Sequence, residues 1–231
     1  MVAGSSPVDA ADVGPAAANE DVIDALDDEL LFVVGNTLFT IYHELGHGLI
    51  DLLGLPVIGR EEDAVDGFAA VTMIPEKPDA VGDALIIAVA DGWQVQSDLA
   101  AERQERHYWG EHALDEQRHF AVVCLMVGSD QDGFYDYALD AGLPEERIES
   151  CSVDFESMKS GWARLLDKHR PGGDHAKGAT GQSIDLLFDP PLPEQDDVFD
   201  LLTTSGLLAD AVLGVGEGIV LPSPIAIRFT A

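Results

Sequence analysis

Two histidines flank a glutamate within a five-residue motif near the start of the chain, His43-Glu44-Leu45-Gly46-His47. Histidines four residues apart on a helix project from the same face, one turn apart. Two neutral imidazoles at this spacing can bind one Zn²⁺, and the glutamate between them falls beside the water that completes the coordination. The motif therefore predicts a zinc centre, with His43 and His47 as ligands and Glu44 as a general base.

A second acidic stretch, EDAVD at residues 62–66, follows the motif after fourteen intervening residues. A catalytic zinc has three protein ligands and one position open for water. Glu62 offers a carboxylate on the next helix, and Asp66, one turn later, can accept the free ring N–H of a ligand histidine. We expect Glu62 to be the third ligand and Asp66 to support a histidine. Asp63 is the alternative third ligand. The alternative interpretation of the whole stretch is an ordinary acidic surface.

A third polar cluster contains His112, Asp115 and His119, which share one face if residues Tyr108 to Val127 form a helix. Metal-dependent hydrolysis of peptides commonly uses a His, Tyr or Arg side chain to stabilise the oxyanion of the tetrahedral intermediate. His112 is our candidate for this role and Arg118 is the second. The alternative is a set of ion pairs on a helix surface.

The elements that must position these residues are two consecutive helices. The first is expected from Glu29 to Leu53 and is nearly all apolar, as in a helix buried at the centre of a domain. It is long enough to cross a membrane, but four polar residues of its second half would then lie in lipid, so we expect no membrane insertion. Gly54, Pro56 and Gly59 should turn the chain into a second helix that begins near Arg60 and stops before Pro75.

The rest of the chain is expected to add more helices and a small β-α-β segment, giving a mainly α (α+β) fold. Further helices are predicted from Asp83 to Arg106, from Phe134 to Gly142 and from Pro144 to about Lys168. Residues 183–190, 198–215 and 218–229 have the patterns of a strand, a helix and a strand. We therefore expect a flexible tail at 1–20, a helical domain at 21–170, a linker at 171–182, and an appendage at 183–231 that packs on the helical domain.

The stretch HELGHGLIDLLGLPVIGREEDAVDGFA resembles the signature of an uncharacterised family of bacterial zinc metallopeptidases and, more broadly, the HExxH…ExxxD pattern of the gluzincins. The resemblance extends through WGEHALDEQRHFAVVCLMVGSD and LPEERIESC to GWARLLDKH, roughly residues 30–169. It implies a zincin-like helical core with one zinc ion per chain. In that family pattern the ligands correspond to His43, His47 and Glu62, the general base to Glu44, and the residue that supports a histidine to Asp66.

The chain contains two cysteines, Cys124 and Cys151. Two buried thiols are expected of a cytosolic protein, whereas a disulfide is expected in an oxidising compartment. The family resemblance includes both cysteines and implies a bridge, which would close a loop of about 27 residues and contribute roughly 3 kcal/mol. No signal peptide is recognisable at the start of the chain. We expect a secreted or periplasmic protein if such a peptide has been removed, and a cytoplasmic one otherwise.

The composition excludes some classes of partner. With 43 acidic against 12 basic residues, the net charge is −31. Phosphate binding needs a basic surface, so nucleic acid is excluded, and anionic membrane surfaces are disfavoured. A saline habitat accounts for the acidity, because salt screens self-repulsion, and attraction of basic substrates is the alternative. An apolar fraction of 46% is ample for a folded core.

These features together predict a zinc-dependent peptidase that acts on a peptide or protein substrate. The alternatives are a zinc-binding domain without proteolytic activity and a helical interaction module without metal. Zincins usually present substrate along an edge strand. No strand clearly precedes the motif helix here, so we expect the C-terminal β segments to be the substitute.

Overall fold

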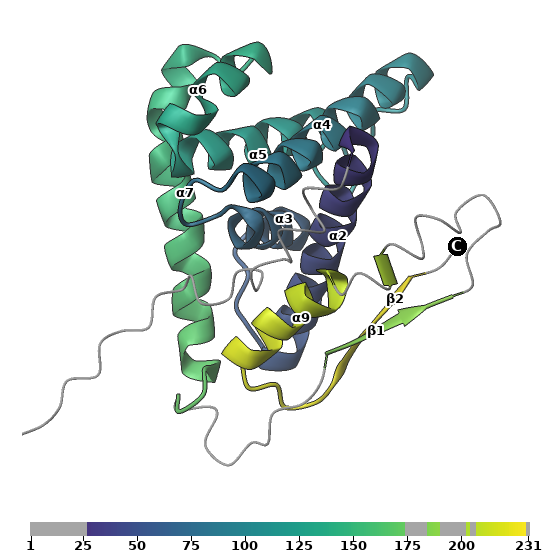
Figure 1. The fold of residues 1–231 in the computed structure, drawn as a ribbon, viewed down its shortest axis with the longest axis vertical. Helices are drawn as coiled ribbons and strands as arrows, with labels where there is room; N and C mark the ends of the chain where they lie inside the picture. The colour runs from purple at the N-terminus through teal and green to yellow at the C-terminus, as the bar shows by residue number, and fades with distance from the viewer. Residues whose placement is uncertain (1–26, 174–183, 190–201, 204–206, 230–231) are drawn as a thin grey trace, which may run out of the picture.

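The structure is a computed structural model that describes residues 27–173, 184–189, 202–203 and 207–229 (Figure 1). Helices make up most of these residues, and two short strands form a parallel sheet. The prediction of a mainly α (α+β) fold with a small C-terminal β-α-β segment is confirmed. The tail predicted at 1–20 lies outside the described residues, as does most of the linker predicted at 171–182.

The motif helix is α2 (Asp28–Leu53), the central helix of the fold. It begins where the Asp27 carboxylate accepts a hydrogen bond from the Leu30 backbone N–H at 3.0 Å. It ends at Gly54, whose φ of 61° lies in the left-handed region that glycine adopts without strain. Its bounds agree with the predicted helix to within one residue.

The next helix, α3 (Glu61–Met73), packs directly against α2. A Cβ atom at Gly46 would lie 2.9 Å from Cγ1 of Val65, so the glycine allows the two backbones to approach closely. Val65 is fully buried at this contact. The glycine inside the motif therefore has a packing role: it brings the acidic stretch of α3 up to the histidines of α2.

Four more described helices complete the helical body. They are α4 (Ala80–Arg103), α5 (Asp115–Ser129), α6 (Gln131–Asp140) and α7 (Glu145–Leu166), the last followed by the 3₁₀ helix η2 (Asp167–His169). Helix α4 packs on α2, α5 and α7 pack on α3, and α6 packs on α5 and α7 (Figure 1). Cys124 of α5 and Cys151 of α7 form a disulfide that spans 27 residues of sequence. In the loop-entropy account such a link stabilises the fold by roughly 3 kcal/mol.

One predicted helix is wrong at its start. The helix expected from Tyr108 to Val127 begins only at Asp115, and residues 105–114 form an irregular loop. A turn closes when the Gly110 N–H donates to the His107 carbonyl oxygen at 3.1 Å. The helix starts where the Gln117 side chain accepts a hydrogen bond from the Leu114 backbone N–H at 3.2 Å. His112 therefore lies on a loop and not on a helix face shared with Asp115 and His119.

The C-terminal segment packs on the motif helix. Strands β1 (Ile184–Phe188) and β2 (Ile225–Phe229) pair in parallel, with Ile184 opposite Ile225, and α9 (Leu207–Gly218) lies between them in sequence. A Cβ atom at Gly48 of α2 would lie 3.1 Å from Cδ1 of Ile225. Figure 1 shows β2 and α9 beside α2. The β segment thus contacts the motif helix at the residue that follows His47.

In the described part of the chain, none of the helices has the length and apolar character needed to cross a membrane.

Candidate metal centre

Three side chains from α2 and α3 converge at the contact between the two helices. Nε2 of His43 lies 3.2 Å from Oε2 of Glu62, and Nε2 of His47 lies 3.4 Å from the same oxygen. The three candidate ligand atoms all lie within 4.8 Å of one another. Ligand atoms that each bind one ion at about 2.0–2.2 Å lie no more than about 4.4 Å apart. The group therefore needs only a small adjustment to hold a single ion.

The other ring nitrogen of each histidine is held by a carboxylate. Nδ1 of His43 lies 2.8 Å from Oδ1 of Asp66, and Nδ1 of His47 lies 2.7 Å from Oε1 of Glu61. A carboxylate can only accept, so the proton of each neutral ring is placed on Nδ1 and the lone pair on Nε2. Both lone pairs then face the Glu62 carboxylate.

This arrangement favours a cation between the three groups. Oε2 of Glu62 is buried and makes no hydrogen bond within the described residues. Two imidazole lone pairs and a carboxylate oxygen repel one another unless a positive charge lies between them. Two imidazoles and one carboxylate are also a common ligand set for zinc and other divalent ions. The residues fit a metal ion in charge, donor type and spacing.

Asp66 is held in its ionised form by its neighbours. It accepts two hydrogen bonds from Arg118, each at 2.6 Å, besides the one from His43. Burial acts to raise the pKa of Asp66, but the hydrogen bonds from His43 and Arg118 and the charge of Arg118 outweigh it and hold the pKa below its usual value. The structure thus places Asp66 where a support for His43 must lie.

Arg118 does not reach the metal centre itself. Its guanidinium is bound to Asp66 and lies over the Trp93 ring, 3.5 Å from the ring centroid. Arg118 was the second candidate for stabilising the oxyanion. Its contacts with Asp66 and the Trp93 ring do not fit that role. It holds the same carboxylate that accepts the hydrogen bond from Nδ1 of His43.

Glu61 is the residue that the sequence reasoning missed. Burial acts to lower the pKa of His47, but the hydrogen bond to Glu61 and the charges of Glu62, Glu61 and Glu44 outweigh it and raise the pKa. In the sequence hypothesis Glu61 has no role beyond an acidic surface. Its place directly before Glu62, at the first residue of α3, was the only signal, and it becomes meaningful once the ring orientation of His47 is known.

Glu44 and His112 lie at the exposed side of the centre. Glu44 is exposed on α2, and its charge contributes to the raised pKa of His47, which places it near that ring. Nε2 of His112 lies 2.9 Å from Oε2 of Glu62, with a half-exposed side chain. Its ring stacks on that of His43, with centroids 6.2 Å apart. The loop therefore brings His112 to the site, although the predicted helix begins only at Asp115.

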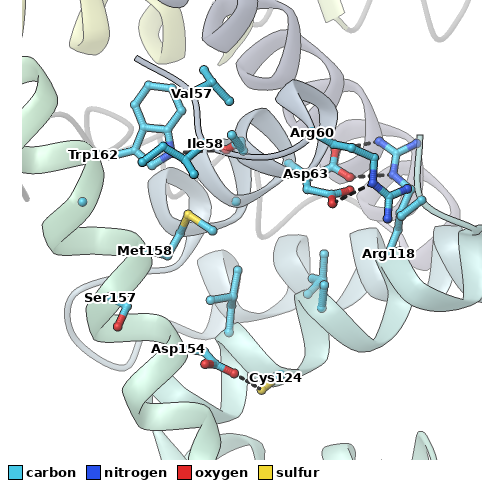
Figure 2. Close-up of a pocket in the computed structure, with 18 of the residues that line it drawn as sticks. Val57, Ile58, Arg60, Asp63, Arg118, Cys124, Asp154, Ser157, Met158 and Trp162 are labelled. Atoms are coloured by element: carbon cyan, nitrogen blue, oxygen red, sulfur yellow. Dashed lines mark hydrogen bonds and ion pairs between the residues drawn. The ribbon is translucent and has the colours of Figure 1, made fainter. Parts of the chain in front are cut away.

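The remaining polar residues of the sequence hypothesis lie elsewhere. Asp63 pairs with Arg60 at 3.2 Å (Figure 2) and is not one of the three grouped ligand candidates. His119 is buried, and its Nδ1 lies 2.8 Å from the Ala90 carbonyl oxygen. Of the two acidic candidates for the third ligand, the structure places Glu62 beside the histidines.

Comparison with known proteins supports this interpretation of the site. A family model described as DUF4344, "Putative metallopeptidase", matches residues 11–166. The matched range contains all of α2 to α7, and with them every residue of the metal centre. This match confirms the resemblance to a metallopeptidase family. No curated protein and no solved structure matches the chain.

Proposed function

The chain belongs to the DUF4344 family, and from this membership and the geometry of its metal centre we propose that it is a zinc-dependent peptidase. One observation carries the proposal: Nε2 of His43 and of His47 converge on Glu62 while carboxylates hold both Nδ1 atoms. Three protein ligands with one position left for water are the arrangement of catalytic zinc. His47 is 27% exposed, so the site can be reached from solvent.

Zinc held by these residues would supply a water molecule whose pKa is lowered toward about 7, together with a positive charge for the substrate carbonyl oxygen. Glu44 accepts the proton of this water as it attacks the carbonyl carbon, and then delivers the proton to the leaving amine. Asp66 and Glu61 keep the Nε2 lone pairs of the two histidines directed at the ion. His112 donates a hydrogen bond to the oxyanion that develops on the carbonyl.

The alternative is a zinc-binding domain without proteolytic activity. Structural zinc sites close all four positions with protein ligands, most often cysteines. In this chain both cysteines are joined in a disulfide remote from the centre in sequence, and an exposed glutamate lies between the two histidine ligands. These features favour catalysis over a structural role.

The test is hydrolysis of a broad peptide library by the zinc-loaded protein, with cleavage products identified by mass spectrometry. We expect cleavage that a zinc chelator abolishes and that added Zn²⁺ restores. A protein that holds one zinc per chain and cleaves nothing in the library would support the non-proteolytic alternative.

The two carboxylates that hold Nδ1 atoms give a separate prediction. Asp66→Ala and Glu61→Gln should each weaken zinc binding by about 10–100-fold without abolishing it, because each frees one ligand ring to turn and change tautomer. Titration against a chelator of known affinity measures the change. Glu61→Gln is the milder variant, since the Glu61 side chain is 47% exposed. Asp63→Asn is the matched control and should bind zinc like the wild type; weakened binding in this control alone would make Asp63 the ligand.

We also propose that the protein works in an oxidising compartment, either secreted or periplasmic. The Cys124–Cys151 disulfide supports this, because such bonds are rare in proteins of the reducing cytosol. Thiol labelling of the protein taken from its native cells tests it: labelled cysteines without prior reduction would contradict it.

A further inference from the structure

A large cavity borders α3 beside the metal centre: Asp66 and Arg118 lie in its lining, but none of the three candidate ligands does. It has a volume of about 960 Å³, at the upper end of the range of about 300–1,000 Å³ usual for ligand pockets. Helices α3, α5 and α7 and the loop at residues 54–60 enclose it (Figure 2). Arg147 and Leu165, at the two ends of α7, both line it, so it extends about 27 Å along that helix.

The middle of this α7 pocket is apolar. Val122 and Leu125 of α5 and Met158 and Trp162 of α7 line it. Ile58, in the loop that borders the pocket, is fully exposed, although isoleucine is among the residues most often buried. A bound apolar group would cover this side chain.

The backbone hydrogen bonding of the pocket walls indicates which kind of apolar ligand fits there. Apart from the loop at residues 54–60, the walls are mainly the helices α3, α5 and α7, whose backbone N–H and C=O groups are already paired within each helix. An extended polypeptide bound there would bury its own backbone groups without partners, which is costly. A hydrocarbon chain has no such groups. The interior of the α7 pocket therefore fits a hydrocarbon chain better than a peptide strand.

The charges of the pocket differ from those of the whole chain. Four arginines and three aspartates line it, although the chain has 43 acidic and only 12 basic residues. Three of these arginines are paired with the three aspartates: Arg60 with Asp63, Arg118 with Asp66, and Arg147 with Asp154.

The fourth arginine, Arg164, is exposed on α7 and donates to Oγ of Ser160 at 3.2 Å. Within the part of the chain that the structure describes, it pairs with no carboxylate. An anionic group at this end of the pocket would supply the missing partner.

We propose that the α7 pocket binds a single-chain anionic amphiphile, a long-chain carboxylate, with its hydrocarbon chain between α3, α5 and α7 and its carboxylate at Arg164. This proposal does not rest on the proposed peptidase function, because none of the three zinc ligands lines the pocket.

The test is calorimetric titration of the full, delipidated chain with oleate below its micelle concentration. We expect saturable binding of one oleate per chain and weaker binding of oleyl alcohol, which has the same chain without the charge. Arg164→Gln should weaken oleate binding about tenfold and leave the binding of oleyl alcohol unchanged, and Arg164→Lys should restore most of the loss.

A variant whose new side chain fills the α7 pocket provides a second test of the proposal. A Cβ atom at Gly161 would have no neighbouring atom within 4 Å, so Gly161→Trp can place its ring in the pocket without a clash at the backbone. It should weaken oleate binding at least about tenfold. Val153→Trp, at an exposed position of the same helix that does not line this pocket, is the matched control and should bind like the wild type. Thermal unfolding verifies that both variants fold.

Several results would overturn the proposal. They are a wild type that does not bind oleate, equal affinities for oleate and oleyl alcohol, and a folded Gly161→Trp variant that binds oleate as tightly as Val153→Trp. A wild-type dimer that Gly161→Trp dissociates would instead make a second copy of the chain the occupant. Loss of peptide cleavage in Gly161→Trp, with no oleate binding by the wild type, would make the pocket part of a substrate cleft.

Discussion

Replacement of Glu44 by glutamine is expected to lower kcat/KM for peptide cleavage by about 10²–10⁴-fold, the usual contribution of a general base. The amide keeps the size of the side chain but cannot accept the proton of the attacking water. Zinc content and the thermal unfolding temperature should stay at wild-type values, because Glu44 is exposed and is not one of the three candidate ligands. Cleavage of a peptide selected from the library, with elemental analysis of the same sample, measures both quantities.

The control for Glu44→Gln is Glu29→Gln, which makes the same change in charge in the exposed first turn of the same helix. It should cleave like the wild type. If Glu44→Gln cleaves as fast as Glu29→Gln, the mechanism is wrong even where the zinc is present. If Glu44→Gln loses zinc together with activity, Glu44 has a role in metal binding and not in proton transfer.

Removal of a histidine ligand is the second change with a large expected effect. The wild type should hold about one zinc per chain, and His43→Ala and His47→Ala should each lose most of it. Each variant keeps only one imidazole and the Glu62 carboxylate, which is too few ligands for a tight zinc site. Elemental analysis after dialysis gives the zinc content. His107→Ala is the control, because this histidine stacks on Trp109 in the loop and belongs to no candidate metal group among the described residues.

Thermal unfolding gives an independent readout of the same variants. A ligand that binds only the folded state stabilises it by about 2.7 kcal/mol when its free concentration is 100 times its Kd. Added zinc should therefore raise the unfolding temperature of the wild type and of His107→Ala, and leave that of His43→Ala and His47→Ala almost unchanged. Stoichiometric zinc in both ligand variants would refute the assignment of the centre.

The parts of the site that depend only on residue spacing within one helix could be predicted from the sequence. The spacing of His43 and His47 on an apolar helix, and of Glu62 and Asp66 on the next one, needs only the period of the α-helix. The short loop at residues 54–60 then limits where the second helix can pack. The helical class and the C-terminal β-α-β segment follow from periodicity in the same way, because each element's pattern lies within the element itself.

Tertiary structure decided which distant groups meet. Arg118 lies 52 residues from Asp66 in sequence and binds it only because α5 packs against α3. His112 reaches Glu62 from a loop whose course no local pattern gives. Glu61 was indistinguishable from its acidic neighbours until the ring orientation of His47 made it a partner. Local periodicity determines which residues share a face, but it contains no information on which faces meet; packing decides that, because it depends on the shapes of all the helices at once.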